Sequence, residues 1–143
     1  MGVEDHQTKN ITLIELPKIE DRRGNLTFLQ NLDQIPFEIK RSYWLYDVPA
    51  DKNRGGHAFK ENEEIIIALS GSFDVEISVG NHKEIITLRR SYQALYIPAL
   101  NWRKLTNFST NALALIVSST FYSPNDYIYD LEELRIQRNE IEK

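Results

Sequence analysis

The sequence predicts an all-β sandwich or barrel that carries one short helix at its C-terminal end. Three observations support this fold class: the strand-like runs are short, turn signals separate them about every 8 to 12 residues, and helical spacing of apolar residues begins only near residue 126. Neither an internal repeat nor a low-complexity linker interrupts the chain. Residues 1–143 are therefore predicted to form a single domain.

The first part of the chain predicts short strands with tight turns between them. Residues 11–16 form an apolar run that ends at Pro17, and residues 26–30 form a second run. Between them, residues 21–25 contain Asp, Gly and Asn, which tolerate turn geometry. The later half of residues 35–47 is rich in aromatic and β-favouring side chains and predicts a longer strand.

A pair of glycines, Gly55 and Gly56, precedes His57 in a segment that we expect to be extended. Glycine allows a sharp bend or a close approach of the backbone to a ligand. In an extended segment His57 and Phe59 share one face, because side chains alternate along a strand. If that face lines a pocket, the imidazole and the phenyl ring lie side by side in it.

The second half of the chain predicts a series of strands. Residues 73–79 alternate between apolar and polar side chains, which is typical of a strand with one wet face, and Gly80-Asn81 is a turn signal that pairs this strand with the next one. The predicted strands are residues 64–69, 73–79, 83–88, 94–97, 102–105 and 113–118.

The two ends of the chain differ from this β-rich middle. Ser123-Pro124-Asn125-Asp126 supplies helix start signals, so we predict a C-terminal helix over residues 126–138, with a polar tail over residues 137–143 that frays. Residues 1–10 are polar and are expected to be flexible.

Composition limits the classes of function. The net charge is −4, with 17 basic against 21 acidic residues, so the overall charge of the chain does not favour nucleic-acid binding. The absence of cysteine excludes disulfides, thiolate metal sites and a cysteine nucleophile. No apolar run approaches the roughly 20 residues that span a bilayer, so we expect no membrane insertion and a cytoplasmic protein.

Six pieces of the sequence fall in an informative order: Asp21-Arg22-Arg23-Gly24, Ile35-Pro36-Phe37-x-Ile39-Lys40-Arg41-x-Tyr43, Arg54-Gly55-x-His57-Ala58-x-Lys60, Leu69-x-Gly71-Ser72, Phe108-Ser109 and Asp126-Tyr127-Ile128. In order and spacing they resemble the cupin-type nucleotide-sugar 3,4-ketoisomerases. These enzymes move the keto group of dTDP-4-keto-6-deoxyglucose from C4 to C3. The resemblance runs from the first strand into the C-terminal helix.

The resemblance implies a cupin or jelly-roll double-stranded β-helix with a dTDP-linked sugar bound in the barrel mouth. It also implies a homodimer in which N-terminal strands are exchanged between subunits. Products of such enzymes supply 3-amino-3,6-dideoxyhexoses for bacterial surface polysaccharides, including lipopolysaccharide O-antigen. We expect no cofactor here.

His57 and Tyr43 are the predicted catalytic residues. Moving a ketone to the next carbon requires a group that takes the C3 proton and returns one at C4 through an enediol, which suits a histidine. Tyr43 matches an active-site tyrosine of the family by resemblance.

Phe59 departs from the family pattern, which is usually His-Ala-His. A phenyl ring cannot carry a proton. Three outcomes stay open: His57 acts with help from Tyr43, the regiochemistry or the C4 stereochemistry differs, or the protein is a catalytically degenerate cupin that binds a nucleotide sugar without turnover.

Metal binding is not expected. Cupins that bind a metal commonly use several histidines and a carboxylate, which suit iron, manganese or zinc. Here Phe59 replaces one such histidine, and Arg103 follows Trp102 where the family commonly reads Trp-His. We therefore predict a metal-free site.

Three arginines are predicted to bind the nucleotide diphosphate, since a guanidinium group gives bidentate contacts to anions. By resemblance they are Arg23, Arg41 and Arg54, although surface salt bridges would explain such residues equally. Arg41 shares a predicted strand face with Ile39 and Tyr43.

The remaining predicted pocket-lining residues are Phe59, Tyr96, Trp102 and Arg103. Aromatic faces can stack on thymine or on the sugar, although core packing is the simpler explanation for Tyr96 and Trp102. The charge run over residues 60–64 is expected to be a solvated edge, with Glu64 as its one candidate to face the pocket.

Overall fold

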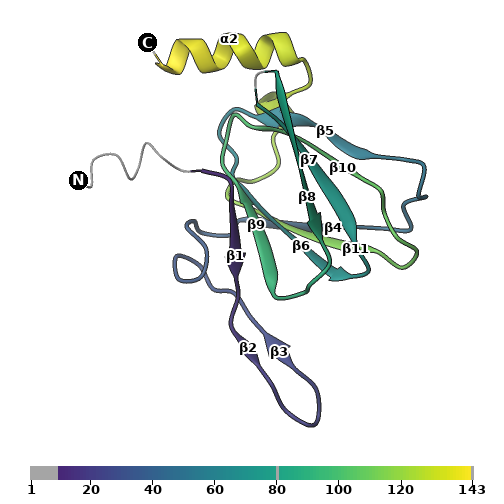
Figure 1. Cartoon of the computed structure of the whole chain (residues 1–143). Helices are drawn as coiled ribbons and strands as arrows, with labels where there is room; N and C mark the ends of the chain where they lie inside the picture. Colours follow the sequence, from purple (N-terminus) through teal and green to yellow (C-terminus); the bar gives the residue numbers. More distant parts are fainter. Residues whose placement is uncertain (1–9, 80, 143) are drawn as a thin grey trace.

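The computed structural model describes residues 10–79 and 81–142, and within those ranges it is a β-sandwich (Figure 1). Two five-stranded antiparallel sheets face each other, and a two-stranded ribbon and a terminal helix are attached to them. This confirms the predicted all-β fold with a short C-terminal helix. Most of the segment predicted to be flexible, residues 1–9, lies outside the described residues, as does Gly80 of the predicted turn.

The strands of the first sheet lie side by side in an order that differs from their order in the sequence. Its strands are, in spatial order, β1 (Thr12–Glu15), β9 (Gln93–Ile97), β6 (Glu64–Ser70), β11 (Leu113–Ser118) and β4 (Arg41–Tyr46). Strand β4 is therefore an edge strand. Its side chains alternate between half-buried and exposed, with Arg41, Tyr43 and Leu45 turned inward, as the sequence predicts.

The second sheet contains the segment with the paired glycines. Its strands are, in spatial order, β12 (Tyr127–Ile128), β5 (Arg54–Phe59), β10 (Trp102–Thr106), β7 (Phe73–Val79) and β8 (His82–Leu88). Strand β5 lies between β12 and β10, so His57 is opposite Arg103 and Phe59 is opposite Tyr127.

The main core fills the space between the two sheets. Strand β7 turns Phe73, Val75 and Ile77 inward and leaves its alternate polar side chains on the outer face, as its period-two pattern predicts. Ile66 and Ile116 meet them from the first sheet. Burial of such side chains contributes about 1.5–3 kcal/mol each.

A second core cluster covers the outer face of the first sheet. Ile35 and Phe37, from the segment between β3 and β4, pack there against Ile65, Ile67 and Tyr96. The first sheet is therefore buried on both faces along part of its length, which explains why β6 reads as a continuous apolar run.

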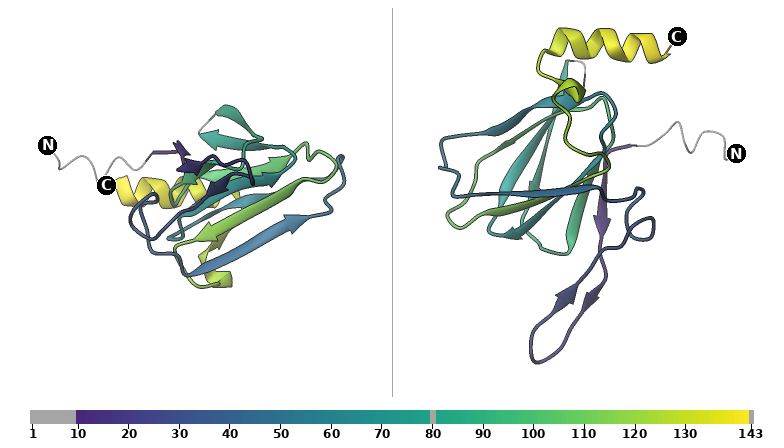
Figure 2. Two further views of the ribbon diagram at one scale, coloured as in Figure 1. Left: turned by 90° about the horizontal axis from the view of Figure 1, so that it is seen from below. Right: turned by 180° about the vertical axis from the view of Figure 1, so that it is seen from behind.

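A hairpin extends away from the sandwich at the end opposite the terminal helix (Figures 1 and 2). It consists of β2 (Lys18–Ile19) and β3 (Leu26–Thr27), which pair antiparallel. The strand predicted over residues 26–30 is thus only two residues long. Apolar side chains of the hairpin are exposed: Ile19 is 55% and Leu26 is 56% accessible.

The C-terminal helix, α2, spans Leu131–Glu142 and begins five residues later than predicted. Ser123 and Pro124 instead start a 3-10 turn over Pro124–Asp126, and Tyr127–Ile128 then pairs with β5. Asp130 begins the helix: its carboxylate accepts a hydrogen bond from the Glu132 amide. The helix continues through the tail that was expected to fray.

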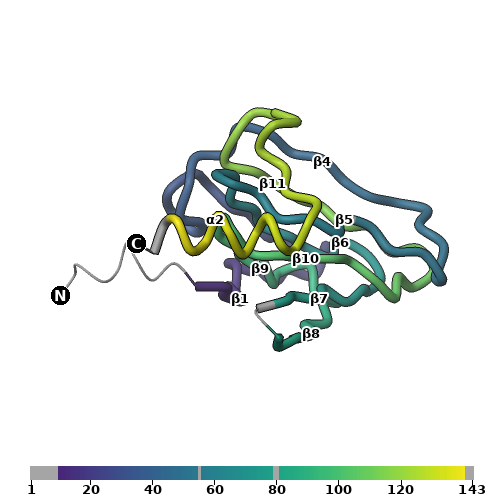
Figure 3. Tube along the Cα trace, turned by 90° about the horizontal axis from the view of Figure 1, so that it is seen from above, coloured from purple at the N-terminus to yellow at the C-terminus, as the bar shows by residue number. Residues whose placement is uncertain are grey.

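Helix α2 lies across one end of the sandwich, above β5 and β10 (Figure 3). Leu134 packs against Ala58 and Ile128, and Trp102 covers the same cluster. Within the described ranges, no helix has the length and apolar character needed to cross a membrane.

Two of the motifs noted in the sequence hold the fold together. Gly71 has a φ of +67°, and a Cβ at this position would lie 2.5 Å from the Ser109 hydroxyl oxygen. That hydroxyl accepts a hydrogen bond from the Ser72 amide at 2.9 Å. Phe108 stacks on Phe73 with ring centroids 5.3 Å apart. These motifs are structural.

Candidate active site

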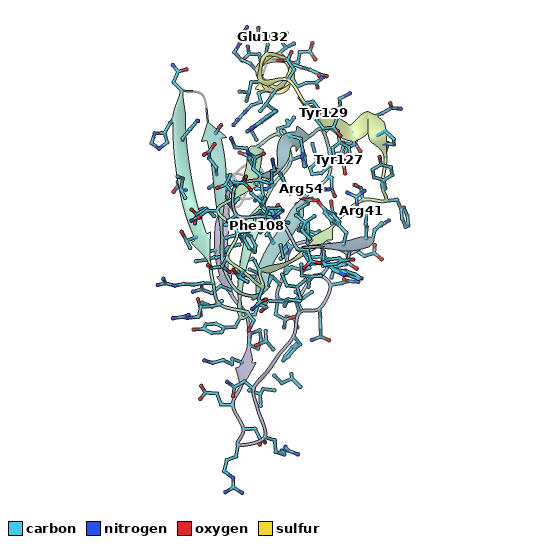
Figure 4. All side chains as sticks on the ribbon, turned by 90° about the vertical axis from the view of Figure 1, so that its right-hand side faces the viewer. Arg41, Arg54, Phe108, Tyr127, Tyr129 and Glu132 are labelled. Carbon is cyan, nitrogen blue, oxygen red and sulfur yellow. The ribbon has the colours of Figure 1, made fainter. Side chains whose placement is uncertain are left out.

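A cavity of about 280 Å³ opens between the two sheets beside strand β4. Apolar side chains, including Ile66, Leu105 and Ile116, form part of its lining. Its polar lining consists of Tyr43, Arg54, His57, Glu64, Arg103, Tyr127 and Tyr129. Figure 4 shows Arg41, Arg54, Tyr127 and Tyr129 gathered on one part of the molecule, below helix α2. An apolar cavity with a few convergent polar groups is typical of a small-molecule site.

His57 is held in this cavity by aromatic rings. Its imidazole lies 4.7 Å from the Phe59 ring and 5.0 Å from the Tyr127 ring, measured between centroids. Its Nε2 atom is buried and has no hydrogen-bond partner in the described part of the chain. Burial, followed by the positive charges of Arg103 and Arg41, lowers the pKa of His57 from 6.5 to about 3. At neutral pH the imidazole is therefore uncharged and can accept a proton.

Tyr43 reaches the cavity from the inner face of β4. Its hydroxyl donates a hydrogen bond to Glu64 Oε2 at 2.6 Å. Burial, together with the Glu64 carboxylate beside it, raises the pKa of Tyr43 above its usual value. The phenol therefore stays protonated, and its proton is directed at Glu64.

Glu64 is the centre of a buried polar network, although the side chain is only 2% exposed. Its Oε2 atom also accepts hydrogen bonds from Ser118 Oγ at 2.9 Å and from Asn62 Nδ2 at 3.3 Å. Arg103 Nη1 donates to Glu64 Oε1 at 2.8 Å. Four donors therefore satisfy one buried carboxylate, as a buried charge requires.

Arg103 is 1% exposed and lies between Glu64 and the Phe59 ring. Its Nε atom donates to the Asn101 carbonyl oxygen at 3.2 Å, and its guanidinium carbon lies 5.1 Å from the Phe59 ring centroid. Its Nη2 atom is buried and has no partner among the described residues. Because an arginine keeps its charge at any ordinary pH, the cavity contains a permanent cation whose Nη2 group is unused.

Phe59 is fully buried behind the lining of the cavity. Its ring contacts the rings of His57 and Tyr127 edge to face, with the Tyr127 centroid at 4.6 Å. The ring thus supports the imidazole and the guanidinium and does not line the cavity itself, which corrects the prediction that Phe59 lines the pocket. His57 and Phe59 lie side by side, as the sequence predicts.

The three predicted diphosphate-binding arginines lie in different places. Arg41 is half-buried, within 5.6 Å of the Tyr43 and Tyr122 ring centroids, and its Nε and Nη1 atoms have no partner among the described residues. Arg54 is exposed and lines the cavity. Arg23 lies at the tip of the β2–β3 hairpin, where its side chain is 89% exposed and pairs with Asp21. Arg23 is not brought to the cavity of its own chain.

The structure does not put Tyr96 or Trp102 in this cavity, which corrects the prediction for both. Side chains alternate along β9 and β10, so Tyr96 and Trp102 point away from the space between the sheets. Tyr96 donates a hydrogen bond to Glu63 in the outer cluster, and Trp102 packs under helix α2. Arg103, the neighbour of Trp102, lines the cavity as predicted.

Tyr127 and Tyr129 also line the cavity, although neither was among the predicted site residues. They lie where a helix was predicted, but the segment is extended and the two rings stack 5.6 Å apart at the cavity. Within the described ranges no three His, Asp or Glu side chains gather as metal ligands would. The cavity thus combines a neutral imidazole, a hydrogen-bonded phenol and several cations, which suits proton transfer on an anionic ligand.

A family model described as "FdtA: WxcM-like, C-terminal" matches residues 9–139 of the chain. A protein of Aneurinibacillus thermoaerophilus, named TDP-4-oxo-6-deoxy-alpha-D-glucose-3,4-oxoisomerase, is 34% identical over 133 residues. The match covers 92% of this chain and 96% of that protein.

Solved structures of similar proteins extend this likeness. The TDP-quinovose 3,4-ketoisomerase WlaRB from Campylobacter jejuni is 40% identical, with a TM-score of 0.84 over 88% of this chain and 97% of its own. A mutant of the 3,4-ketoisomerase QdtA from Thermoanaerobacterium thermosaccharolyticum, in complex with TDP-4-keto-6-deoxyglucose, is 30% identical. Its TM-score is 0.88 over 92% of this chain and 96% of its own.

Proposed function

Because the chain belongs to the FdtA family, described as WxcM-like, C-terminal, we propose that it is a TDP-sugar 3,4-ketoisomerase. Its substrate is a TDP-linked 4-keto-6-deoxyhexose, in which it moves the keto group from C4 to C3. The relatives with this activity, one of them in complex with TDP-4-keto-6-deoxyglucose, support the proposal. Its product would enter deoxysugar biosynthesis for surface polysaccharides.

One observation about this chain carries the proposal. His57 Nε2 and Arg103 Nη2 are buried, lie in residues that line one cavity, and have no partner within the described ranges. A buried polar atom without a partner costs roughly 1–3 kcal/mol. A polar ligand that enters the cavity would remove this cost, and the keto and hydroxyl oxygens of a sugar provide such partners.

The roles of the cavity residues follow from their chemistry. Neutral His57 removes the C3 proton, which leaves an enediolate, and then returns the proton to C4. Arg103 lies beside His57 and stabilises the negative charge that develops on the sugar oxygens. Tyr43 exchanges protons with those oxygens. Arg54, which lines the cavity, and Arg41, whose Nε and Nη1 atoms have no partner among the described residues, would bind the diphosphate.

Incubation with TDP-4-keto-6-deoxyglucose in D₂O tests this proposal. We expect a new 3-keto sugar by NMR, with deuterium at C4 wherever the proton on His57 exchanges with solvent. His57→Asn should lower the rate by about 10²–10⁴-fold while TDP still binds. The matched control is His82→Asn, since His82 lies at the far edge strand β8.

Calorimetric titration with TDP distinguishes the two ways in which the proposal could fail. Binding without turnover, under conditions in which an authentic relative is active, would identify a nucleotide-sugar-binding protein instead. Absence of both binding and turnover would contradict the proposal as a whole.

We further propose that the protein is a homodimer that exchanges its β2–β3 hairpins. The hairpin exposes Ile19 and Leu26, and the outer face of the first sheet exposes Trp44, Tyr46 and Leu69. Contiguous exposed apolar surface of this kind is typical of an interface. Strand β1 pairs with β9 of its own chain, so the hairpin is the element that is free to reach a second copy.

Two hollows support this arrangement. One, of about 600 Å³, lies between the hairpin and the first sheet, and another, of about 550 Å³, lies beside Trp44 and Tyr46. Both include Leu69 and Leu115, so the two hollows adjoin. The lining beside Trp44 is mainly apolar, and the lining beside the hairpin mixes apolar side chains with polar ones such as Arg89 and Arg90. The hairpin of a second copy fits the groove that these adjoining hollows form. Its tip would then carry Arg23 toward the edge strand β4 of the partner, whose inner face lines the cavity.

Light scattering of the eluted protein tests the dimer. Trp44→Glu should convert the dimer to a monomer, because it puts a charge in the groove. The matched control is Ile85→Glu, since Ile85 is 60% exposed on the other sheet and Trp44 is 57% exposed. A dimer that survives Trp44→Glu would contradict this interface. Arg23→Ala should weaken TDP binding only if the hairpin reaches the partner.

A further inference from the structure

We propose that Glu64, acting through Tyr43, holds the second proton of the reaction. This inference rests on the proposed function. It concerns the proton that must leave the O3 hydroxyl and reach O4, which is distinct from the proton that His57 carries from C3 to C4.

The direction of the Tyr43 hydrogen bond is the first observation. A phenol has one O–H donor and lone pairs that accept. Here the donor is used by Glu64 Oε2 at 2.6 Å. The lone pairs of Tyr43 are therefore left for a donor in the cavity, and the O3 hydroxyl of the sugar is such a donor.

The second observation is that Glu64 is fixed as the next acceptor. Ser118 and Asn62 donate to the same oxygen that Tyr43 uses, and Arg103 holds the other oxygen. The side chain cannot turn away from Tyr43 without breaking these bonds. Arg103 also pairs with the negative charge of the carboxylate, with Nη1 2.8 Å from Glu64 Oε1.

The protons balance over one turnover. His57 takes the proton from C3, and the electron pair of that bond forms the C3–C4 double bond of an enediolate with its charge on O4. The O3 hydroxyl gives its proton to the Tyr43 oxygen as the Tyr43 proton moves to Glu64. The C3 ketone forms as His57 protonates C4, and Glu64 returns its proton through Tyr43 to O4. No other reactant is needed.

A neighbouring pair of the same residue types provides an internal comparison. Tyr96 donates a hydrogen bond to Glu63, but this pair lies on the outer face of the first sheet. Glu63 and Glu64 are adjacent in the chain, so they point to opposite faces. Of these two pairs, the Tyr43–Glu64 pair is the one that lines the cavity.

The test compares Glu64→Gln with Glu63→Gln in the isomerase assay. Glutamine keeps the shape of the side chain but does not hold the proton. We expect Glu64→Gln to lower kcat by about 10²-fold or more, with KM and TDP affinity within about 3-fold of the wild type. Glu63→Gln should leave kcat within about 3-fold.

A loss of structure alone would not change which step limits the rate. If Glu64 carries the proton, the solvent isotope effect of D₂O on kcat should rise in Glu64→Gln, since the oxygen-to-oxygen transfer becomes limiting. The kinetic isotope effect of deuterium at C3 on kcat should fall toward one, or stay there if it is already near one in the wild type. A lower kcat with both isotope effects unchanged would show that Glu64 is only structural.

Glu64→Asp covers the case in which Glu64→Gln does not fold. It keeps the charge opposite Arg103 but withdraws the carboxylate from Tyr43 by one methylene. We expect kcat to fall at least tenfold in the folded variant, and a kcat within about 3-fold of the wild type would overturn the inference. If the wild type itself does not isomerise the sugar, the proposed function fails first, and Glu64 then has no proton to hold.

Discussion

The buried pair of Glu64 and Arg103 should respond unequally to removal of either partner. Glu64 accepts four hydrogen bonds, and three of them come from residues other than Arg103. Arg103 donates only to Glu64 and to the Asn101 carbonyl, and its Nη2 atom has no partner among the described residues. A buried carboxylate can also neutralise itself by binding a proton, whereas a guanidinium cannot.

These differences set the expected magnitudes. Glu64→Gln leaves a permanent buried cation without a counter-ion, which costs about 3–5 kcal/mol of unfolding free energy. Arg103→Met leaves a carboxylate with three donors, so we expect a loss of about 1–3 kcal/mol. The double variant should lose less than the sum of the two, by roughly 2 kcal/mol, because neither charge is then left alone.

Urea denaturation of the three variants measures these values, provided that the m-value stays constant. Arg135→Met is the matched control, since Arg135 and Glu132 form an exposed ion pair on helix α2. It should cost at most about 1 kcal/mol. A larger loss for Arg103→Met than for Glu64→Gln, or simple additivity in the double variant, would refute the reasoning.

Further predictions concern stability. The pKa of His57 is lowered from 6.5 to about 3. Between these two pH values the unfolded chain therefore binds more protons than the folded protein, so the free energy of unfolding should fall as the pH drops from 6.5 to about 3. The slope should be at most about 1.4 kcal/mol per pH unit and should be absent in His57→Asn, as measured by urea titrations at several pH values. Both Gly71 and Gly24 have a positive φ, so an alanine is strained at either position. Gly71→Ala should cost about 2–4 kcal/mol by the same method, because a Cβ would also lie 2.5 Å from Ser109 Oγ, whereas Gly24→Ala, with no heavy atom within 4 Å, should cost less. In thermal unfolding, Leu134→Ala should cost about 2–4 kcal/mol and the exposed Ile136→Ala less than about 1.

The β architecture could be predicted because it depends on a simple local pattern. Alternation in residues 73–79 and along β4 fixes which side chains face inward, and the structure keeps that pattern. The same alternation puts the consecutive residues Trp102 and Arg103 on opposite faces of their strand, so it could have shown that they do not both face the cavity. Aromatic content alone suggested the pocket for Trp102, whereas its place on the strand determines that it packs under helix α2.

The helix start and the role of Glu64 depend on contacts that are distant in sequence. Residues 126–128 carry helix signals, but pairing of Tyr127 and Ile128 with β5 overrides them. Glu64 stands in a charged run that resembles a solvated edge. Its burial follows from Tyr43 and Arg103, which lie 21 and 39 residues away in the chain. No local pattern contains that information.

Phe59 and Arg103, which stand where the expected pattern has histidines, depend on each other physically. A guanidinium buried at Arg103 needs a carboxylate, which Glu64 supplies at 2.8 Å. It also needs a neighbour that is not easily charged, and the Phe59 ring at 5.1 Å offers a π face instead of a second cation. The side chain of Phe59 lies fully buried behind the lining of the cavity, so an imidazole at this position would not reach a sugar bound there. Phe59→His should therefore not raise the isomerase rate on its own.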